Sequence, residues 1–210
     1  MGSMNRGGLA SSTFEFGDRL SGYTAQGLVD SGLDGGKMLL KIADDDVSTA
    51  AAIEACAMAD NQLAQPGLVA RIETVAAFRN EAGLARIDSD PMRTAQAIGV
   101  APGLGTTSAL TWCRVSISED IEMSLEASTL PSVILGGDSD LTSPKVREQW
   151  LTALRHPTIR GVVAGRALLY PEVDDIRAAV CVNLDLLEQV KVDVVPELVG
   201  AVPIRPGRDG

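Results

Sequence analysis

Short aliphatic segments alternate along the chain with longer segments in which apolar residues recur at the spacing of one helix face. Strands are predicted over residues 37–42, 69–74, 110–115, 132–135 and 161–164. Helices are predicted over residues 47–62, 91–98, 118–128, 143–155 and 171–190. Five strand-then-helix units in succession indicate parallel strands joined by helical crossovers. The pattern therefore predicts an α/β protein.

Two α/β architectures fit this order, the open doubly wound sheet and the closed (β/α)₈ barrel. The predicted strands are nearly continuous apolar runs, so we expect both faces of the sheet to be covered. A barrel ordinarily takes about 250 residues, whereas this chain has 210, and its first twelve residues look like the end of a strand and its loop. We therefore expect a parallel (β/α) TIM-barrel type that is N-terminally incomplete, with about six of the eight strands. This partial barrel domain would span residues 1–190, followed by a C-terminal tail over residues 191–210.

The composition and charge of the chain limit its partners. Hydrophobic residues make up 45% of the chain and aromatic residues 3%, which predicts an aliphatic core. The net charge of −10 argues against nucleic acid or an anionic membrane as a partner. The three cysteines form no CxxC pair, and a single histidine excludes a multi-histidine metal site. We expect a cytoplasmic protein without metal or other cofactor that takes a small-molecule substrate and forms a homo-oligomer through open strand edges.

Lys37 and Glu73 are charged residues that lie in largely apolar predicted strands. Active sites of barrels lie at the C-terminal ends of the strands, and charged side chains are rarely buried without a partner. We therefore expect Lys37 and Glu73 to form an inward-facing pair at adjacent strand ends. Such a pair can position a carbonyl or hydroxyl group and relay protons, although a structural ion pair would leave the same pattern.

Glycines follow the last two predicted strands. Gly136 and Gly137 follow the strand over residues 132–135, and Gly165 and then Arg166 follow the strand over residues 161–164. Backbone N–H groups of glycine can approach phosphate oxygens closely, and an arginine adds charge-assisted hydrogen bonds. The spacing predicts a phosphate site here, with tight turns as the plainer alternative. Further substrate-binding candidates follow the N-terminal strand remnant and are Asn5 and Arg6.

A family resemblance rests on five segments that occur together and in order. They are residues 2–9, 33–40, 108–112, 135–138 and 163–171, the last reading Val-Ala-Gly-Arg-Ala-Leu-Leu-Tyr-Pro. With this set, the chain resembles actinobacterial (β/α)₈-barrel class I aldolases related to the deoxyribose-phosphate and tagatose-bisphosphate aldolases. Genes of this family are often found with genes of myo-inositol catabolism. The resemblance implies cleavage or formation of a carbon–carbon bond in a phosphorylated sugar or keto compound, through a lysine Schiff base.

Carried over to this chain, the resemblance implies catalytic roles for Lys37 on the fourth barrel strand and Glu73 on the fifth, and a phosphate cradle at the two glycine loops. On the sixth strand the related aldolases carry their imine-forming lysine in a Thr-Trp-x-Lys pattern, where this chain has Thr111-Trp112-Cys113-Arg114. A guanidinium stays protonated and cannot act as an amine nucleophile. If Arg114 faces the barrel centre, it needs a carboxylate or an anion beside it, and Glu73 is the nearest candidate.

Two functions therefore stay open at this point. The chain is either an aldolase-family lyase in which Lys37 replaces the usual lysine, or a catalytically impaired protein that binds a sugar phosphate or acts as an assembly partner. A nicotinamide-dependent open sheet is disfavoured because no GxGxxG motif follows a predicted strand.

Overall fold

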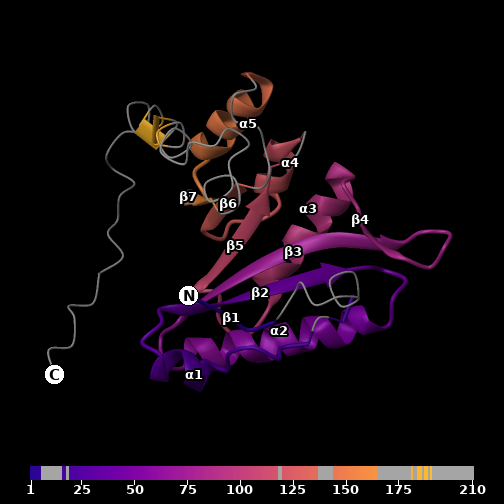
Figure 1. Ribbon diagram of the computed structural model, residues 1–210, viewed down its shortest axis with the longest axis vertical. Coiled ribbons are helices and arrows are strands. Elements are labelled where there is room, and N and C mark those ends of the chain that lie inside the picture. Colours follow the sequence, from indigo (N-terminus) through magenta and orange to yellow (C-terminus); the bar gives the residue numbers. More distant parts are fainter. Residues whose placement is uncertain are drawn as a thin grey trace, which may run out of the picture.

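A curled parallel sheet forms the centre of the molecule in the computed structural model (Figure 1), which describes residues 1–5, 16–17, 19–117, 120–136, 144–164, 181, 184–185, 187–188 and 190. Six parallel strands lie side by side in the order of the chain. They are β1 (Gly2–Ser3), β2 (Gly35–Ile42), β3 (Val69–Arg79), β5 (Thr111–Ser116), β6 (Ser132–Gly136) and β7 (Ile159–Ala164). A doubly wound sheet would reverse its strand order at a switch point, and these strands do not. The predicted fold class, an incomplete parallel (β/α) barrel, is confirmed.

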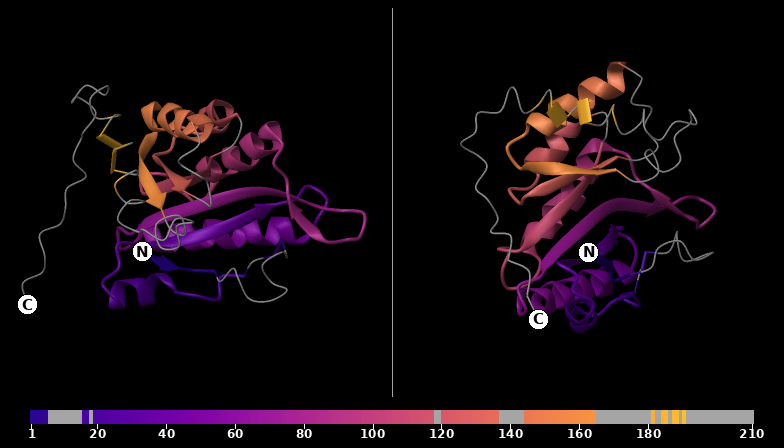
Figure 2. Two further views of the ribbon diagram at one scale, coloured as in Figure 1. Left: turned by 45° about the horizontal axis from the view of Figure 1, so that its top comes forward. Right: turned by 60° about the vertical axis from the view of Figure 1, so that its left-hand side comes forward.

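Helices form the outer layer around this sheet. They are α1 (Ala25–Asp30), α2 (Ser48–Ala64), α3 (Pro91–Val100), α4 (Ile121–Glu126) and α5 (Pro144–Arg155), with a 3₁₀ turn at Ala101–Gly103. Helix α2 contacts β2 and β3, and α5 contacts β7 at the other end of the sheet, as two further views show (Figure 2). The expected helix start at Pro91 is confirmed, with Asp90 as N-cap accepting a hydrogen bond from the N–H of Arg93 at 2.9 Å. The predicted helix over residues 171–190 and the predicted tail lie largely outside the described residues.

Strand side chains alternate between two faces with different surroundings. On the helix-covered face, residues such as Met38, Leu40, Ile72, Cys113 and Ile134 are buried in one continuous hydrophobic core. The residues between them on β2, β3 and β5 are mostly only half-buried. The expectation that both faces of the sheet are covered is therefore wrong for these strands within the described residues, because the helices pack on one face only. Each large aliphatic side chain buried under the helices contributes about 1.5–3 kcal/mol.

Strand β3 is five residues longer than predicted and continues into a hairpin. Its last three residues pair in antiparallel fashion with β4 (Ala85–Ile87), and the turn between the strands includes Gly83 at φ +74°. No strand is predicted from the sequence for residues 75–79 or 85–87, since the segment is polar. A second small core compensates for that polarity and consists of Phe16, Ala43, Ala77 and Ala85.

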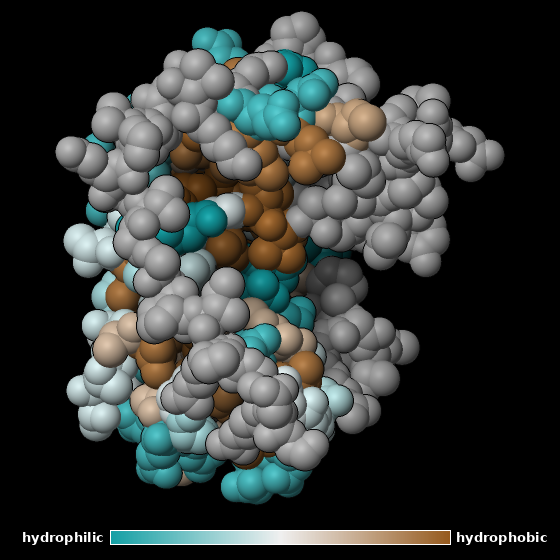
Figure 3. Space-filling model, turned by 90° about the vertical axis from the view of Figure 1, so that its left-hand side faces the viewer, coloured by the Kyte–Doolittle hydropathy of each residue, from teal (hydrophilic) through white to brown (hydrophobic). Residues whose placement is uncertain are grey.

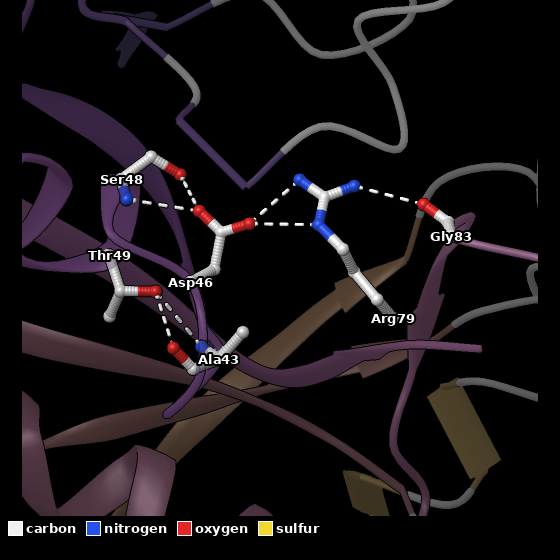
Figure 4. A network of polar contacts seen from close by, with 6 residues as sticks. All are labelled: Ala43, Asp46, Ser48, Thr49, Arg79 and Gly83. Carbon is white, nitrogen blue, oxygen red and sulfur yellow. Dashed lines mark hydrogen bonds and ion pairs between the residues drawn. The ribbon is translucent and has the colours of Figure 1, made fainter. Parts of the chain in front are cut away.

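A polar network ties this hairpin to the loop between β2 and α2 (Figure 4). The Asp46 carboxylate accepts hydrogen bonds from the N–H and hydroxyl of Ser48 and from Arg79 Nε and Nη2, the arginine bonds measuring 2.9 and 2.7 Å. Arg79 also donates to the Gly83 carbonyl at 3.1 Å and lies over the Phe16 ring, 4.6 Å from its centre. The hydrogen bonds from Ser48, and then those from Arg79, lower the pKa of Asp46.

We predict that Asp46→Asn lowers the free energy of unfolding by about 1–2 kcal/mol at neutral pH, the range for hydrogen bonds to a charged group that is partly exposed. Because the folded pKa lies below the unfolded one, this stabilisation is present above the unfolded pKa and is lost as the pH falls through the folded pKa. Urea unfolding of both proteins at several pH values measures the difference, which should shrink in acid. Asp45→Asn, at an exposed neighbour, is the control, and an equal loss in that variant would contradict the prediction.

Candidate active site

Four charged side chains share the face of the sheet that the helices leave uncovered. Lys37 lies on β2, Arg71 and Glu73 on β3, and Arg114 on β5, all at positions that alternate with core residues and all half-buried. In the strand register Lys37 lies beside Arg71, which in turn lies beside Trp112. Seen from the left-hand side of Figure 1, the molecule shows a hollow in which hydrophobic and hydrophilic surfaces adjoin (Figure 3).

An ion pair joins two of these residues across neighbouring strands. Arg114 Nη1 donates a hydrogen bond to Glu73 Oε2 at 2.5 Å, with the two side chains 15% and 16% exposed. The expectation that Glu73 is the carboxylate beside Arg114 is confirmed. Glu73 is also close enough to act electrostatically on Lys37. Its hydrogen bond goes to Arg114, however, so the expected direct pair of Lys37 and Glu73 is wrong.

The position of the cluster along the strands also differs from the expectation. Lys37 is the third residue of β2, which runs on to Ile42, and Glu73 lies in the middle of β3, which runs on to Arg79. These residues therefore lie within the sheet and not at the strand ends. The expected strand ends are wrong because both strands continue past the charged residues. Leu40 on β2 and Val75 and Ala77 on β3 still pair with neighbouring strands.

Arg71 is the member of the cluster that sequence reasoning missed. It is two residues before Glu73, so the two-residue period of a strand places both on one face. This period was the signal that could have found it. Within the described part of the chain the guanidinium of Arg71 makes no hydrogen bond, and the Nε atoms of Arg71 and Arg114 are both buried without a partner.

The surroundings of Lys37 favour its neutral amine. Burial lowers the pKa of Lys37, and the positive charges of Arg114 and Arg71 lower it further, while Glu73 opposes them. Burial and Arg114 likewise lower the pKa of Arg71, although a guanidinium remains charged at physiological pH. Each of these lowering effects increases the fraction of Lys37 in the neutral form, which is the form in which an amine acts as a nucleophile.

The predicted phosphate residues are placed only in part. Gly136 ends β6, where it pairs with Ala164 of β7; Arg6, Gly137, Gly165 and Arg166 lie outside the described residues. Asn5 is buried, and its side-chain amide donates to the carbonyl of Leu39 at 2.6 Å and accepts from the Leu39 N–H at 3.0 Å. Both ends of this amide are therefore engaged with the backbone of β2.

No other part of the described structure gathers comparable chemistry. A hollow of about 310 Å³ is lined by Asp120, Lys145 and their neighbours on α4 and α5, and one of about 300 Å³ by Asp44, Arg93 and residues of α3. Neither includes a residue of the charged cluster, which lies on an open face. Among the described residues, no three His, Cys, Asp or Glu side chains are grouped as a metal site would need, and no helix has the length and apolarity to cross a membrane.

Parallel strands in chain order, with a lysine, two arginines and a glutamate on the inner face of their curve, define a protein of the (β/α)-barrel class. The model of the Cgl0159-like family matches residues 1–183, and the chain belongs to this family. The crystal structure of Cgl0159 from Corynebacterium glutamicum is similar at 36% identity with a TM-score of 0.80. That match covers 91% of this chain and 63% of the other, so this chain spans a little under two thirds of the relative's length.

More distant solved structures have the same fold. A Schiff base-forming fructose-1,6-bisphosphate aldolase is 15% identical with a TM-score of 0.63, over 85% of this chain and 67% of that one. An archaeal fructose-1,6-bisphosphate aldolase is 14% identical with a TM-score of 0.66, over 90% of this chain and 69% of that one. No curated protein matches the chain. At these identities the aldolases show the fold alone.

We predict that Arg71→Gln raises the pKa of Lys37, because it removes one of the charges that lower it, and that Glu73→Gln lowers this pKa, because it removes the charge that opposes them. Competitive acetylation across a pH series, read by peptide mass spectrometry, measures the titration of Lys37, with the exposed Lys145 as internal reference. Arg86→Gln, on the exposed part of β4, is the control. Identical Lys37 titration curves in all four proteins would contradict the prediction.

Proposed function

We propose that this chain is an aldolase-type lyase that cleaves or forms a carbon–carbon bond in a phosphorylated sugar or keto compound, with Lys37 as the imine-forming amine. The observation that carries the proposal is the position of Lys37, a half-buried lysine beside Arg71 and near the Arg114–Glu73 pair, with its pKa lowered. Similarity in fold to a Schiff base-forming aldolase supports it. By analogy with barrels in general, the sequence-predicted cradle at Gly136, Gly137, Gly165 and Arg166 would hold the phosphate.

The chemistry can be followed through the residues of the cluster. The neutral Nζ of Lys37 adds to the carbonyl carbon of the substrate, and the carbonyl oxygen takes one proton from Nζ and one from solvent and leaves as water, which gives a protonated iminium. Glu73 then accepts the proton of the β-hydroxyl group as the carbon–carbon bond breaks, and the electron pair of that bond moves into the iminium. The resulting enamine is protonated on carbon, and water releases the product and the amine.

A second function, anion binding without turnover, is favoured by one specific observation. Arg114 stands where the resemblance places the imine-forming lysine, and its guanidinium cannot take that role. The surplus of cations over carboxylates in the cluster would still bind a sugar phosphate. Trapping and binding experiments separate the two functions.

We predict that borohydride reduction in the presence of dihydroxyacetone phosphate or a short keto acid leaves a stable adduct on Lys37 and on no other of the four lysines in the chain. Peptide mass spectrometry locates the adduct. Lys37→Arg keeps a long basic side chain but offers no amine nucleophile and should abolish labelling, whereas Lys145→Arg on the exposed surface should leave it intact. Absence of any lysine adduct, together with calorimetric binding of the phosphate compound, would reject the lyase proposal in favour of the second function.

A separate prediction concerns Arg114→Lys. The substitution places an amine at the position of the family's usual lysine, next to Glu73, and leaves Lys37 as a neighbouring cation that lowers the new lysine's pKa. We expect imine trapping at residue 114 in this variant, measured with the same carbonyl compounds. Arg86→Lys is the matched control, since it adds a lysine outside the cluster. Equal labelling of both introduced lysines would show that the cluster confers no special reactivity.

A further inference from the structure

Two positive charges face each other across strands β2 and β3 without a bonded counterion. Lys37 and Arg71 are register partners, and neighbouring strands lie about 4.8 Å apart. Like charges directly opposite each other destabilise a sheet, yet within the described residues neither side chain makes a hydrogen bond to a carboxylate. The one carboxylate of the cluster, Glu73, bonds to Arg114. The cluster therefore has room for one more negative charge beside Lys37 and Arg71, and no carboxylate of the described residues provides it.

We propose that Arg71 binds the carboxylate of a 2-oxo acid whose keto carbon lies at Lys37, so that the carbonyl substrate of this site is a small 2-oxo carboxylate. This inference rests on the proposed lyase function, since it uses Lys37 as the amine. It adds a residue, Arg71, and a substrate class that the resemblance to sugar-phosphate aldolases does not imply.

The charges of the cluster leave Arg71 in need of an anion. The guanidinium groups of Arg71 and Arg114 stay protonated, and Glu73, the one carboxylate of the cluster, is bonded to Arg114. The positive charge of Arg71 is therefore left for an anionic ligand, and a carboxylate matches it with a single negative charge.

The geometry of the hydrogen-bond donors favours the same ligand. Arg114 already uses Nη1 for Glu73, whereas Arg71 has its buried Nε without a partner and none of its donors engaged among the described residues. A guanidinium presents Nε and one terminal nitrogen as a planar fork that matches a carboxylate. In a 2-oxo acid the carboxylate is bonded directly to the keto carbon, and Lys37 and Arg71 are likewise direct neighbours across two strands. Trp112, half-buried on the other side of Arg71, offers apolar surface to the remainder of the molecule.

The test compares carbonyl compounds that differ in charge. Pyruvate, its neutral methyl ester and dihydroxyacetone phosphate are each titrated with borohydride present, and the labelled fraction of Lys37 is measured by mass spectrometry. The ester is intrinsically the better electrophile than pyruvate, so without recognition it labels at least as well. We expect pyruvate to reach half-labelling at about 10- to 100-fold lower concentration than the ester, the range of a hydrogen-bonded charge. Arg71→Gln should abolish this preference, Arg71→Lys should keep part of it, and Arg86→Gln should leave it unchanged.

Three results would count against the inference, and they show whether the lyase proposal fails with it. Equal labelling by pyruvate and its ester would overturn it while leaving Lys37 as the amine. Preferential labelling by dihydroxyacetone phosphate that depends on Arg71 would assign Arg71 to a phosphate instead. If no compound labels Lys37, the lyase proposal fails, and calorimetric titration with oxalate decides the anion site by itself. Oxalate binding weakened at least about 10-fold by Arg71→Gln would support a carboxylate site, and binding that is absent or unaffected would reject it.

Discussion

The hydrogen bond between Arg114 and Glu73 is the interaction on which the open face of the sheet depends. It joins β5 to β3 and places the only carboxylate of the cluster among three cations. Both side chains are mostly shielded from water, and removing one partner of a buried pair costs about 3–5 kcal/mol because the other charge is left uncompensated. With Glu73 committed to Arg114, Lys37 and Arg71 share a weakly compensated positive field. Burial and the positive charges of Arg114 and Arg71 lower the pKa of Lys37, and the same surplus of positive charge attracts an anion.

The opposite face of the same strands stabilises the fold despite the like charges in the cluster. Residues such as Leu40, Ile72 and Cys113 alternate with the charged ones and pack beneath the helices in one continuous core. Because adjacent strand positions point to opposite faces, the cluster does not interrupt that core. A strand is also a rigid support, so the charged side chains start from fixed backbone positions two residues apart on β3 and one strand apart between β2 and β3.

Two contacts outside the cluster fix the strands that carry it. Asn5 bonds to both backbone groups of Leu39 on β2, two residues after Lys37, where its amide takes the place of a neighbouring strand. At the far end of β3, the Asp46–Arg79 network holds the hairpin against the loop that follows β2. Strands β2 and β3 are thus restrained at two levels, both of which follow Lys37 and Arg71 along the strands.

The sequence by itself determined the alternation of strands and helices, the parallel barrel class and the start of α3 at Pro91, because these follow from local periodicity and capping. It also identified Lys37 and Glu73, since a charge within an apolar strand is conspicuous, but the pair it expected between them is wrong. The family resemblance singled out Arg114, with Glu73 as the nearest carboxylate, and the structure joins these two. Only the tertiary structure decided that Arg71 joins them beside Lys37, that the cluster lies within the sheet, and that β3 continues into a hairpin on a small second core. These features depend on strand register and on contacts between residues distant in sequence, such as Phe16 with Arg79. Register is set by the packing of one whole face against the helices, which no local pattern of residues contains.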